Sequence, residues 1–122
     1  MKKIILILIS LLLLSSCSSS VFKGDVKTGD DYICINSDSF SGEKRYEIDV
    51  EQDGTATLDL FVEEGVLKIV VENNGVKSLE GKYTKEWNQY GKTTFILEKG
   101  TYEISTKGKD FKGTCEIGWK AN

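Results

Sequence analysis

The chain has 122 residues, of which 29% are charged, with a formal net charge of −3, no histidine and no proline. This length allows a single domain, and the acidic balance disfavours a nucleic-acid partner. Without histidine the chain lacks the commonest general base and the commonest metal ligand, which excludes His-dependent catalytic triads and His-ligated metal sites. We therefore predict a protein that is not an enzyme and that uses no metal or other cofactor.

The N-terminus is typical of an export signal. Lys2 and Lys3 precede a predominantly apolar run over residues 4–14. A helix needs about 20 apolar residues to cross the hydrocarbon core of a bilayer, so this run is too short for a permanent span. We predict that residues 1–16 are a signal peptide that is removed from the mature protein.

Residues 14–17, an aliphatic residue, two serines and Cys17, resemble the lipobox of bacterial lipoproteins. The resemblance implies that the Cys17 thiol receives a diacylglycerol and that the signal peptide is cut directly before it. Each buried methylene contributes about 0.8 kcal/mol, so several acyl chains would hold the protein at a membrane. The expected location is the outer face of a bacterial cell membrane, or the outer membrane in a Gram-negative cell. An ordinary secretory signal whose cleavage site contains a Cys is the alternative.

The segment after the predicted cleavage site is rich in small and polar residues. Ser18–Ser20 and the glycines at positions 24 and 29 indicate a flexible tether, so we assign residues 17–30 to the lipidated Cys and its tether. Removing residues 1–16 deletes two lysines and no acids, which changes the net charge from −3 to −5. A body this acidic gains nothing from anionic lipid, so the acyl chains must supply the attachment.

Apolar and polar residues alternate with a period of two from Tyr32 onward, most clearly over 56–62 and 111–119. This period is typical of strands that bury one face. The predicted strands are 31–37, 44–52, 55–63, 66–73, 76–83, 92–98, 100–106 and 110–119, with Asp53-Gly54 as a tight hairpin turn and Thr84–Gly91 as a loop or a single helical turn. We predict an all-β domain over 31–122, an antiparallel β-sandwich of jelly-roll or immunoglobulin-like type with seven to eight strands. A closed barrel is the alternative.

Two cysteines remain after the lipidated one, Cys34 in the first predicted strand and Cys115 in the last. Thiols outside the cytoplasm commonly pair, and a disulfide here would close a long loop. The parity of Ile33 and Ile35 would place Cys34 on the face opposite to the apolar face that carries Cys115. If Tyr32 and Cys34 face inward instead, this objection to a disulfide vanishes, so a disulfide and two buried free thiols both stay open.

Aromatic residues gather in the one irregular segment, where Tyr83, Trp87 and Tyr90 lie beside amide and lysine side chains. Aromatic faces next to amides are typical of sites that bind sugars or peptides, so these three are the candidate ligand-binding residues. The alternative is that Tyr83 and Trp87 close one end of the fold, with Tyr90 the most exposed. Trp119 continues an apolar parity and is predicted to lie in the core.

Two family resemblances follow from these motifs. Residues 65–71, 92–104 and 111–119 are similar to small uncharacterised lipoproteins of low-GC Gram-positive bacteria and to jelly-roll modules of the pre-peptidase C-terminal type, which implies a β-sandwich. The order Tyr32, Cys34, Gly81, Tyr83, Trp87 and Cys115 resembles membrane-bound inhibitors of C-type lysozyme, which are small β lipoproteins bridged by a Cys pair.

The predicted function is a membrane-anchored, non-enzymatic binding or envelope-interaction module outside the cytoplasm. Its partners would be the membrane, through Cys17, and a glycan or protein of the cell envelope, with no nucleic acid. The alternatives are an enzyme inhibitor resembling the lysozyme inhibitors, and an accessory subunit without a small ligand.

Overall fold

The computed structural model describes residues 20–122. The predicted signal peptide and Cys17 lie outside this range. Of the described residues, 81% are in strands, which confirms the all-β antiparallel class and excludes a helical fold. Within residues 20–122, no helix is long and apolar enough to span a bilayer.

Residues 20–122 form six strands and one short helix. They are β3 (Val21–Thr28), β4 (Tyr32–Val50), β5 (Gly54–Asn73), β6 (Val76–Tyr83), the 3₁₀ helix η1 (Lys85–Gln89), β7 (Lys92–Leu97) and β8 (Gly100–Ala121). The strands make one antiparallel sheet in the order β3-β4-β8-β5-β6, and β7 pairs with the first half of β5.

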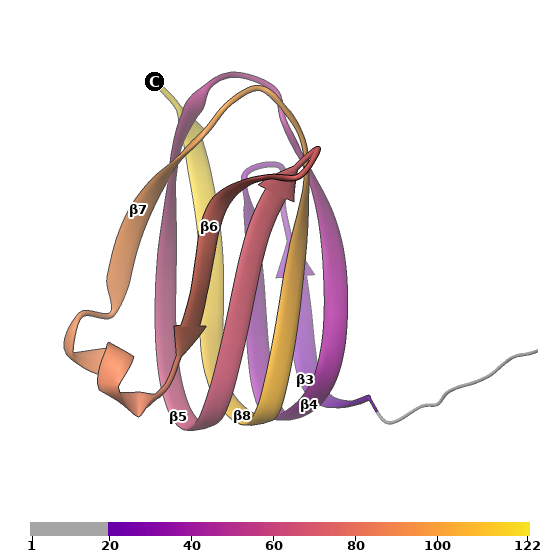
Figure 1. Ribbon diagram of the computed structural model, residues 1–122, viewed down its shortest axis with the longest axis vertical. Coiled ribbons are helices and arrows are strands. Elements are labelled where there is room, and N and C mark those ends of the chain that lie inside the picture. Colours follow the sequence, from indigo (N-terminus) through magenta and orange to yellow (C-terminus); the bar gives the residue numbers. More distant parts are fainter. Residues whose placement is uncertain (1–19) are drawn as a thin grey trace, which may run out of the picture.

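The three long strands β4, β5 and β8 bend near their middles and double back, so the sheet folds over on itself (Figure 1). The first layer holds β3, β7, the first halves of β4 and β5 and the second half of β8. The second layer holds β6 and the other halves of the three long strands. We call the end where the strands bend the bend end, and the opposite end the loop end.

The strand count differs from the sequence prediction. Three pairs of predicted strands, 31–37 with 44–52, 55–63 with 66–73 and 100–106 with 110–119, are each one bent strand. Gly65, which lies between two of these predicted strands, marks no turn between strands but stands beside the register shifts around Glu64 within the continuous pairing of β5 with β8. The result is one sheet of six strands, where the sequence predicts seven to eight strands in a sandwich.

The predicted tight hairpin at Asp53-Gly54 is also wrong. β8 lies between β4 and β5, so these two consecutive strands are not hydrogen-bonded to each other. The link instead carries the chain from the second layer to the first at the loop end. Asp53 has another role there, because its Oδ1 accepts a 2.8 Å hydrogen bond from the backbone N–H of Lys99 in the β7–β8 connection.

Part of the predicted tether belongs to the folded body. Val21–Thr28 is β3, paired along its length with β4. Phe22 packs edge-on against buried Phe40 with ring centroids 5.8 Å apart, and the Lys44 ammonium lies 5.0 Å from the Phe22 ring centroid. These contacts order a segment whose glycines indicate flexibility when composition alone is considered.

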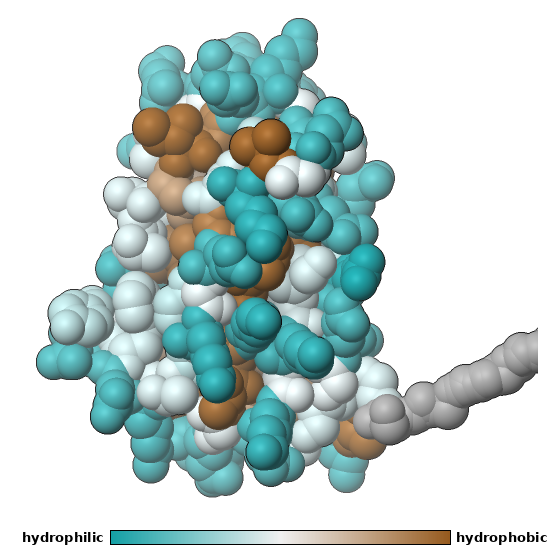
Figure 2. Space-filling view, in the orientation of Figure 1, coloured by the Kyte–Doolittle hydropathy of each residue, from teal (hydrophilic) through white to brown (hydrophobic). Residues whose placement is uncertain are grey.

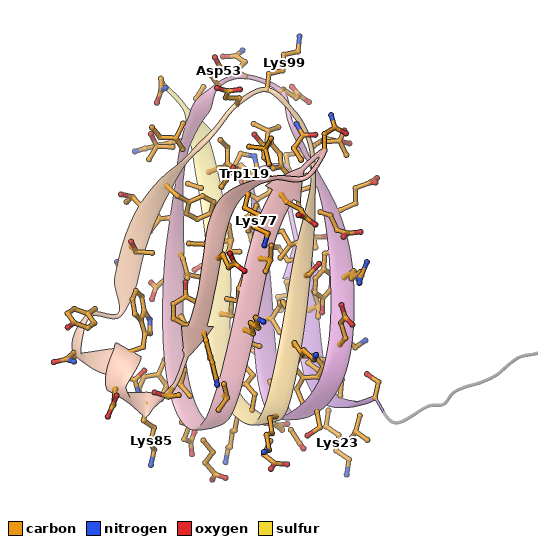
Figure 3. The ribbon with its side chains drawn as sticks, in the orientation of Figure 1. Lys23, Asp53, Lys77, Lys85, Lys99 and Trp119 are labelled. Carbon is orange, nitrogen blue, oxygen red and sulfur yellow. The ribbon has the colours of Figure 1, made fainter. Side chains whose placement is uncertain are left out.

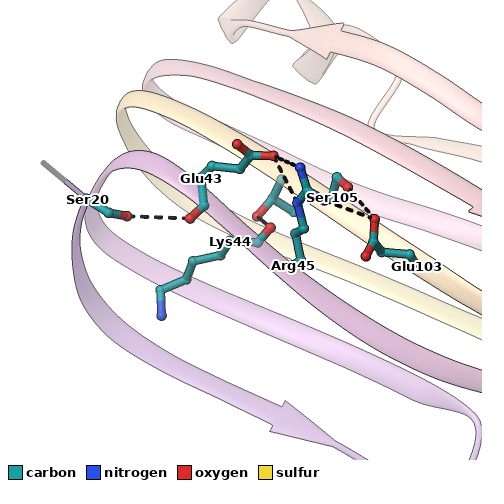
Figure 4. A network of polar contacts seen from close by, with 7 residues as sticks. Ser20, Glu43, Lys44, Arg45, Glu103 and Ser105 are labelled. Atoms are coloured by element: carbon teal, nitrogen blue, oxygen red, sulfur yellow. Dashed lines mark hydrogen bonds and ion pairs between the residues drawn. The ribbon is translucent and has the colours of Figure 1, made fainter. Parts of the chain in front are cut away.

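A network of polar contacts connects the residue before β3 with the outer face of the second layer (Figure 4). The Ser20 hydroxyl donates a 3.5 Å hydrogen bond to the Glu43 carbonyl oxygen. Arg45 pairs with Glu43 at 2.9 Å and with Glu103 at 3.5 Å, and its hydrogen bond to Glu43 raises the pKa of the guanidinium. Because these side chains are exposed, the ion pairs add little to stability.

The core lies between the layers and follows the predicted alternation. Its fully buried members include Leu58, Leu60, Leu67, Ile69, Ile104, Phe111 and Ile117. Trp119, which the sequence places in the core, is only partly buried and packs against the edge of the core at the loop end. Its indole therefore reaches the surface.

Candidate functional site

The three predicted ligand-binding aromatic residues lie in a row that runs from the core to the surface. Tyr83 is 7% exposed, Trp87 is half-buried and Tyr90 is 70% exposed. The Tyr83 and Trp87 ring centroids are 4.9 Å apart, and those of Trp87 and Tyr90 are 5.8 Å apart. Burial raises the pKa of the Tyr83 hydroxyl. Of the three, only Tyr90 presents most of its side chain to solvent.

Two polar side-chain groups of this segment, on Trp87 and Asn88, are hydrogen-bonded within the fold. The Trp87 indole N–H donates a 3.1 Å hydrogen bond to the Leu60 carbonyl. The Asn88 side chain accepts a bond from the Val62 N–H at 2.9 Å and donates one to the Val62 carbonyl at 2.7 Å. Together these hydrogen bonds provide partners for backbone N–H and carbonyl groups at the edge of β5, beside its bend. The contacts fit the alternative in which this segment closes one side of the fold.

Cys34 and Cys115 are free thiols, so of the two alternatives that the sequence leaves open the structure has the unbridged one. In the β4–β8 register Cys34 faces Glu116, while Cys115 faces Ile35. Cys34 is therefore on the outer face of the first layer and Cys115 is in the core, as the parity argument indicates. This result removes the bridged pair from the features shared with the lysozyme inhibitors.

Thiol labelling checks this assignment. Burial raises the pKa of Cys115 to about 12, and burial together with Glu116 and Asp25 raises the pKa of Cys34. The thiolate is the reactive form, so at neutral pH we expect maleimide to modify Cys34 slowly and Cys115 not at all in the folded protein. The rate at Cys34 should increase with pH. After denaturation without reductant both should react quickly, and protection of both would contradict the free-thiol state.

A different cluster forms at the loop end, around Trp119 (Figure 3). Three adjoining surface hollows of about 380, 380 and 460 Å³ all have Trp119 in their walls. Tyr32 lines the first and second, and Tyr46 lines the second. Tyr46 is half-buried, and burial raises the pKa of its hydroxyl. We call these three hollows, which share Trp119 in their walls, the Trp119 groove.

The Trp119 groove is strongly acidic. Its walls carry the carboxylates of Asp30, Asp31, Glu47, Asp49, Glu51, Asp59 and Glu116. Lys120 is the single cationic side chain among the described residues that line it. Asp49 accepts a 2.9 Å hydrogen bond from the Thr101 hydroxyl, and Asp59 lies 3.8 Å from the Lys92 ammonium. The groove thus combines aromatic faces with a large excess of negative charge.

Sequence reasoning missed this groove because its residues come from distant segments. The β3–β4 turn brings Asp30 and Asp31 beside Trp119, whose backbone N–H donates a 2.9 Å hydrogen bond to the Asp31 carbonyl oxygen. Asp49 and Glu51 arrive from the end of β4 and the link that follows it. The sequence did hold one signal for the groove, the acidic residues that cluster around 30–31 and 49–53. The same residues also fit the exposed face of an alternating strand, so the cluster did not indicate a site.

Comparison with known proteins adds no assignment. No family model matches the chain, and no curated protein is significantly similar to it.

Proposed function

We propose that the protein is a membrane-anchored bacterial lipoprotein that acts as a non-enzymatic binding module, with the Trp119 groove as its binding site. The observation that carries the proposal is the partly exposed Trp119 at the meeting point of three acidic hollows. Large aromatic side chains at a concave, partly desolvated surface contribute strongly to recognition.

The chemistry of the groove favours a cationic ligand. An ammonium or guanidinium group over the face of Trp119, Tyr32 or Tyr46 gains a cation–π attraction. The surrounding carboxylates, including Asp30 and Glu51, add hydrogen-bonding oxygens and charge complementarity. A Lys- or Arg-rich segment of an envelope protein satisfies both requirements, and we propose it as the partner.

The position of the groove suits a protein attached through Cys17. β3 begins at Val21 at the bend end, where Val21 pairs with Ser41. The four residues from Cys17 to Val21 span at most about 14 Å, so the bend end would lie close to the lipid headgroups. The loop end is half of a long strand away, about 30 Å, so the groove would face away from the membrane (Figure 1).

A titration with two synthetic peptides tests the site. We expect an Arg-rich peptide to bind the protein, more weakly as salt increases, and an acidic peptide of equal length not to bind. Trp119→Ala and the double variant Asp30→Asn with Glu51→Gln should each weaken binding about tenfold or more. Circular dichroism verifies that each variant is folded.

Tyr90→Ala is the matched control, since it removes an exposed aromatic outside the groove. It should leave affinity unchanged. Loss of binding on Tyr90→Ala but not on Trp119→Ala would move the site to the η1 segment. The anchoring part of the proposal is tested separately by mass spectrometry, which should find a mature chain that starts at an acylated Cys17.

A further inference from the structure

The free edge of β7 is a surface that the proposed function does not use. Among the described strands β7 pairs only with β5, and it forms the rim of the first layer (Figure 1). Ile96 on β7 is 71% exposed, and Val76 at the start of neighbouring β6 is 70% exposed. Figure 2 shows separate apolar patches in the upper part of this face, with hydrophilic residues between them. An edge of this kind offers unpaired backbone groups and apolar side chains together.

The sequence of β7 is suited to pairing. Residues 93–97 are two threonines, a phenylalanine, an isoleucine and a leucine, all but one of them β-branched or aromatic. Natural edge strands are commonly protected by proline, by bulges or by charges in their middle. The register of β7 with β5 runs without a shift from Lys92 to Leu97. The one charged residue of β7 is Lys92 at its start, and Glu98 follows directly after its end.

We propose that β7 pairs antiparallel with β7 of a second copy of this chain, about a two-fold axis that passes beside Phe95. A two-fold axis normal to the sheet keeps the outer face of each copy outward. Alternate residues of a strand face opposite sides of the sheet. Two residues that lie directly opposite each other across the β7–β7 pair must therefore both be even-numbered or both be odd-numbered. Lys92, Thr94 and Ile96 are on the outer face, and Phe95 and Leu97 are on the inner one.

The charges at the strand ends favour this register and this partner. With Phe95 opposite its own copy, Lys92 of each chain faces Glu98 of the other, which makes two symmetric ion pairs. Thr94 faces Ile96 of the other chain, so the exposed isoleucine gains a β-branched neighbour. The Lys92 side chain is 69% exposed, and its 3.8 Å ion pair with Asp59 is itself exposed and therefore weak, so Lys92 can exchange it for Glu98 of the other copy.

A six-residue edge is small for a protein interface, so the association should be weak. We expect a dimer that forms in the upper micromolar range and that dissociates on dilution. The inference does not depend on the Trp119 groove or on lipidation, although attachment to a common membrane would raise the local concentration of the chain.

Sedimentation velocity tests the proposal. The full chain and its charge-exchange variants are measured in detergent over a dilution series. Glu98→Lys places two lysines opposite each other at both ends and should weaken dimerisation about tenfold. Adding Lys92→Glu restores opposite charges and should restore the dimer. Glu64→Lys, the same charge change at the bend end, is the control and should have no effect. A chain that stays monomeric at every concentration, or a dimer indifferent to Glu98→Lys, overturns the proposal.

Cross-linking tests the register. In an antiparallel pair, directly opposed residues are close enough for a disulfide. The double variant Thr94→Cys with Ile96→Cys should therefore give a covalent dimer under mild oxidation. Thr94→Cys alone should not exceed the background from the native cysteines, because Thr94 faces Ile96 of the other copy. Equal cross-linking by the single variant would contradict the register through Phe95.

Discussion

Replacing Gly65 by alanine is expected to lower the free energy of unfolding by about 3 kcal/mol or more. Gly65 lies at the bend of β5 with φ = +78°, in the left-handed region that disfavours a side chain. A Cβ at this position would collide with the backbone carbonyls of Lys109 and Asp110 at the bend of β8. Those carbonyls belong to the adjacent bent strand and cannot move aside like the end of a flexible side chain.

Gly91→Ala separates the two causes of this loss. Gly91 has the same φ of +78°, but a Cβ there would meet no atom within 4 Å. This variant should lose only about 1 to 2 kcal/mol, the cost of the left-handed conformation. Urea denaturation of both variants measures the difference. Equal losses would show that close contact between the two bends is unimportant for stability.

Asn88→Ala is expected to lower the free energy of unfolding by about 2 to 3 kcal/mol. The Asn88 amide makes two hydrogen bonds to the backbone of Val62, where β5 is about to bend. Without them the N–H and the carbonyl of a fully buried residue lose their partner from η1. The adjacent Trp87 bond to Leu60 should then also weaken, since both residues are on the same short helix.

The neighbouring exposed Gln89 provides the control, and Gln89→Ala should change stability by less than about 0.5 kcal/mol. Asn88→Asp retains an acceptor for the Val62 N–H but places a carboxylate oxygen against the Val62 carbonyl, so it should be at least as destabilising as alanine near neutral pH. Thermal and urea unfolding measure all three variants. A neutral Asn88→Ala would contradict the structural role of η1.

The strands themselves were largely predictable, because a strand with one buried face must alternate. The alternation over residues 56–62 places Ala56, Leu58, Leu60 and Val62 inward, and all four are buried. The same local argument predicted a single helical turn as one option for Thr84–Gly91, where η1 lies. The parity of Ile33 and Ile35 also offered opposite faces for Cys34 and Cys115 as one of two alternatives, and this is the one that the structure has.

Local patterns failed where a residue type has two structural uses. A glycine after an acid marks a hairpin turn or a bend within a strand, and only the contact of Gly65 with the β8 backbone distinguishes these. Residues 21–28 are polar and glycine-containing, and their order depends on pairing with β4 and on the packing of Phe22 against Phe40. Neither partner is near in sequence.

By itself, the sequence determined the all-β class, the face that each strand buries and the absence of histidine chemistry, because these depend on composition and on a two-residue period. The tertiary structure decided the strand order, the doubling back of the sheet, the free thiols and the Trp119 groove. These depend on contacts between segments tens of residues apart, such as Asp31 with Trp119. Their energies arise only when the folded sheet brings those segments together, so no local pattern encodes them.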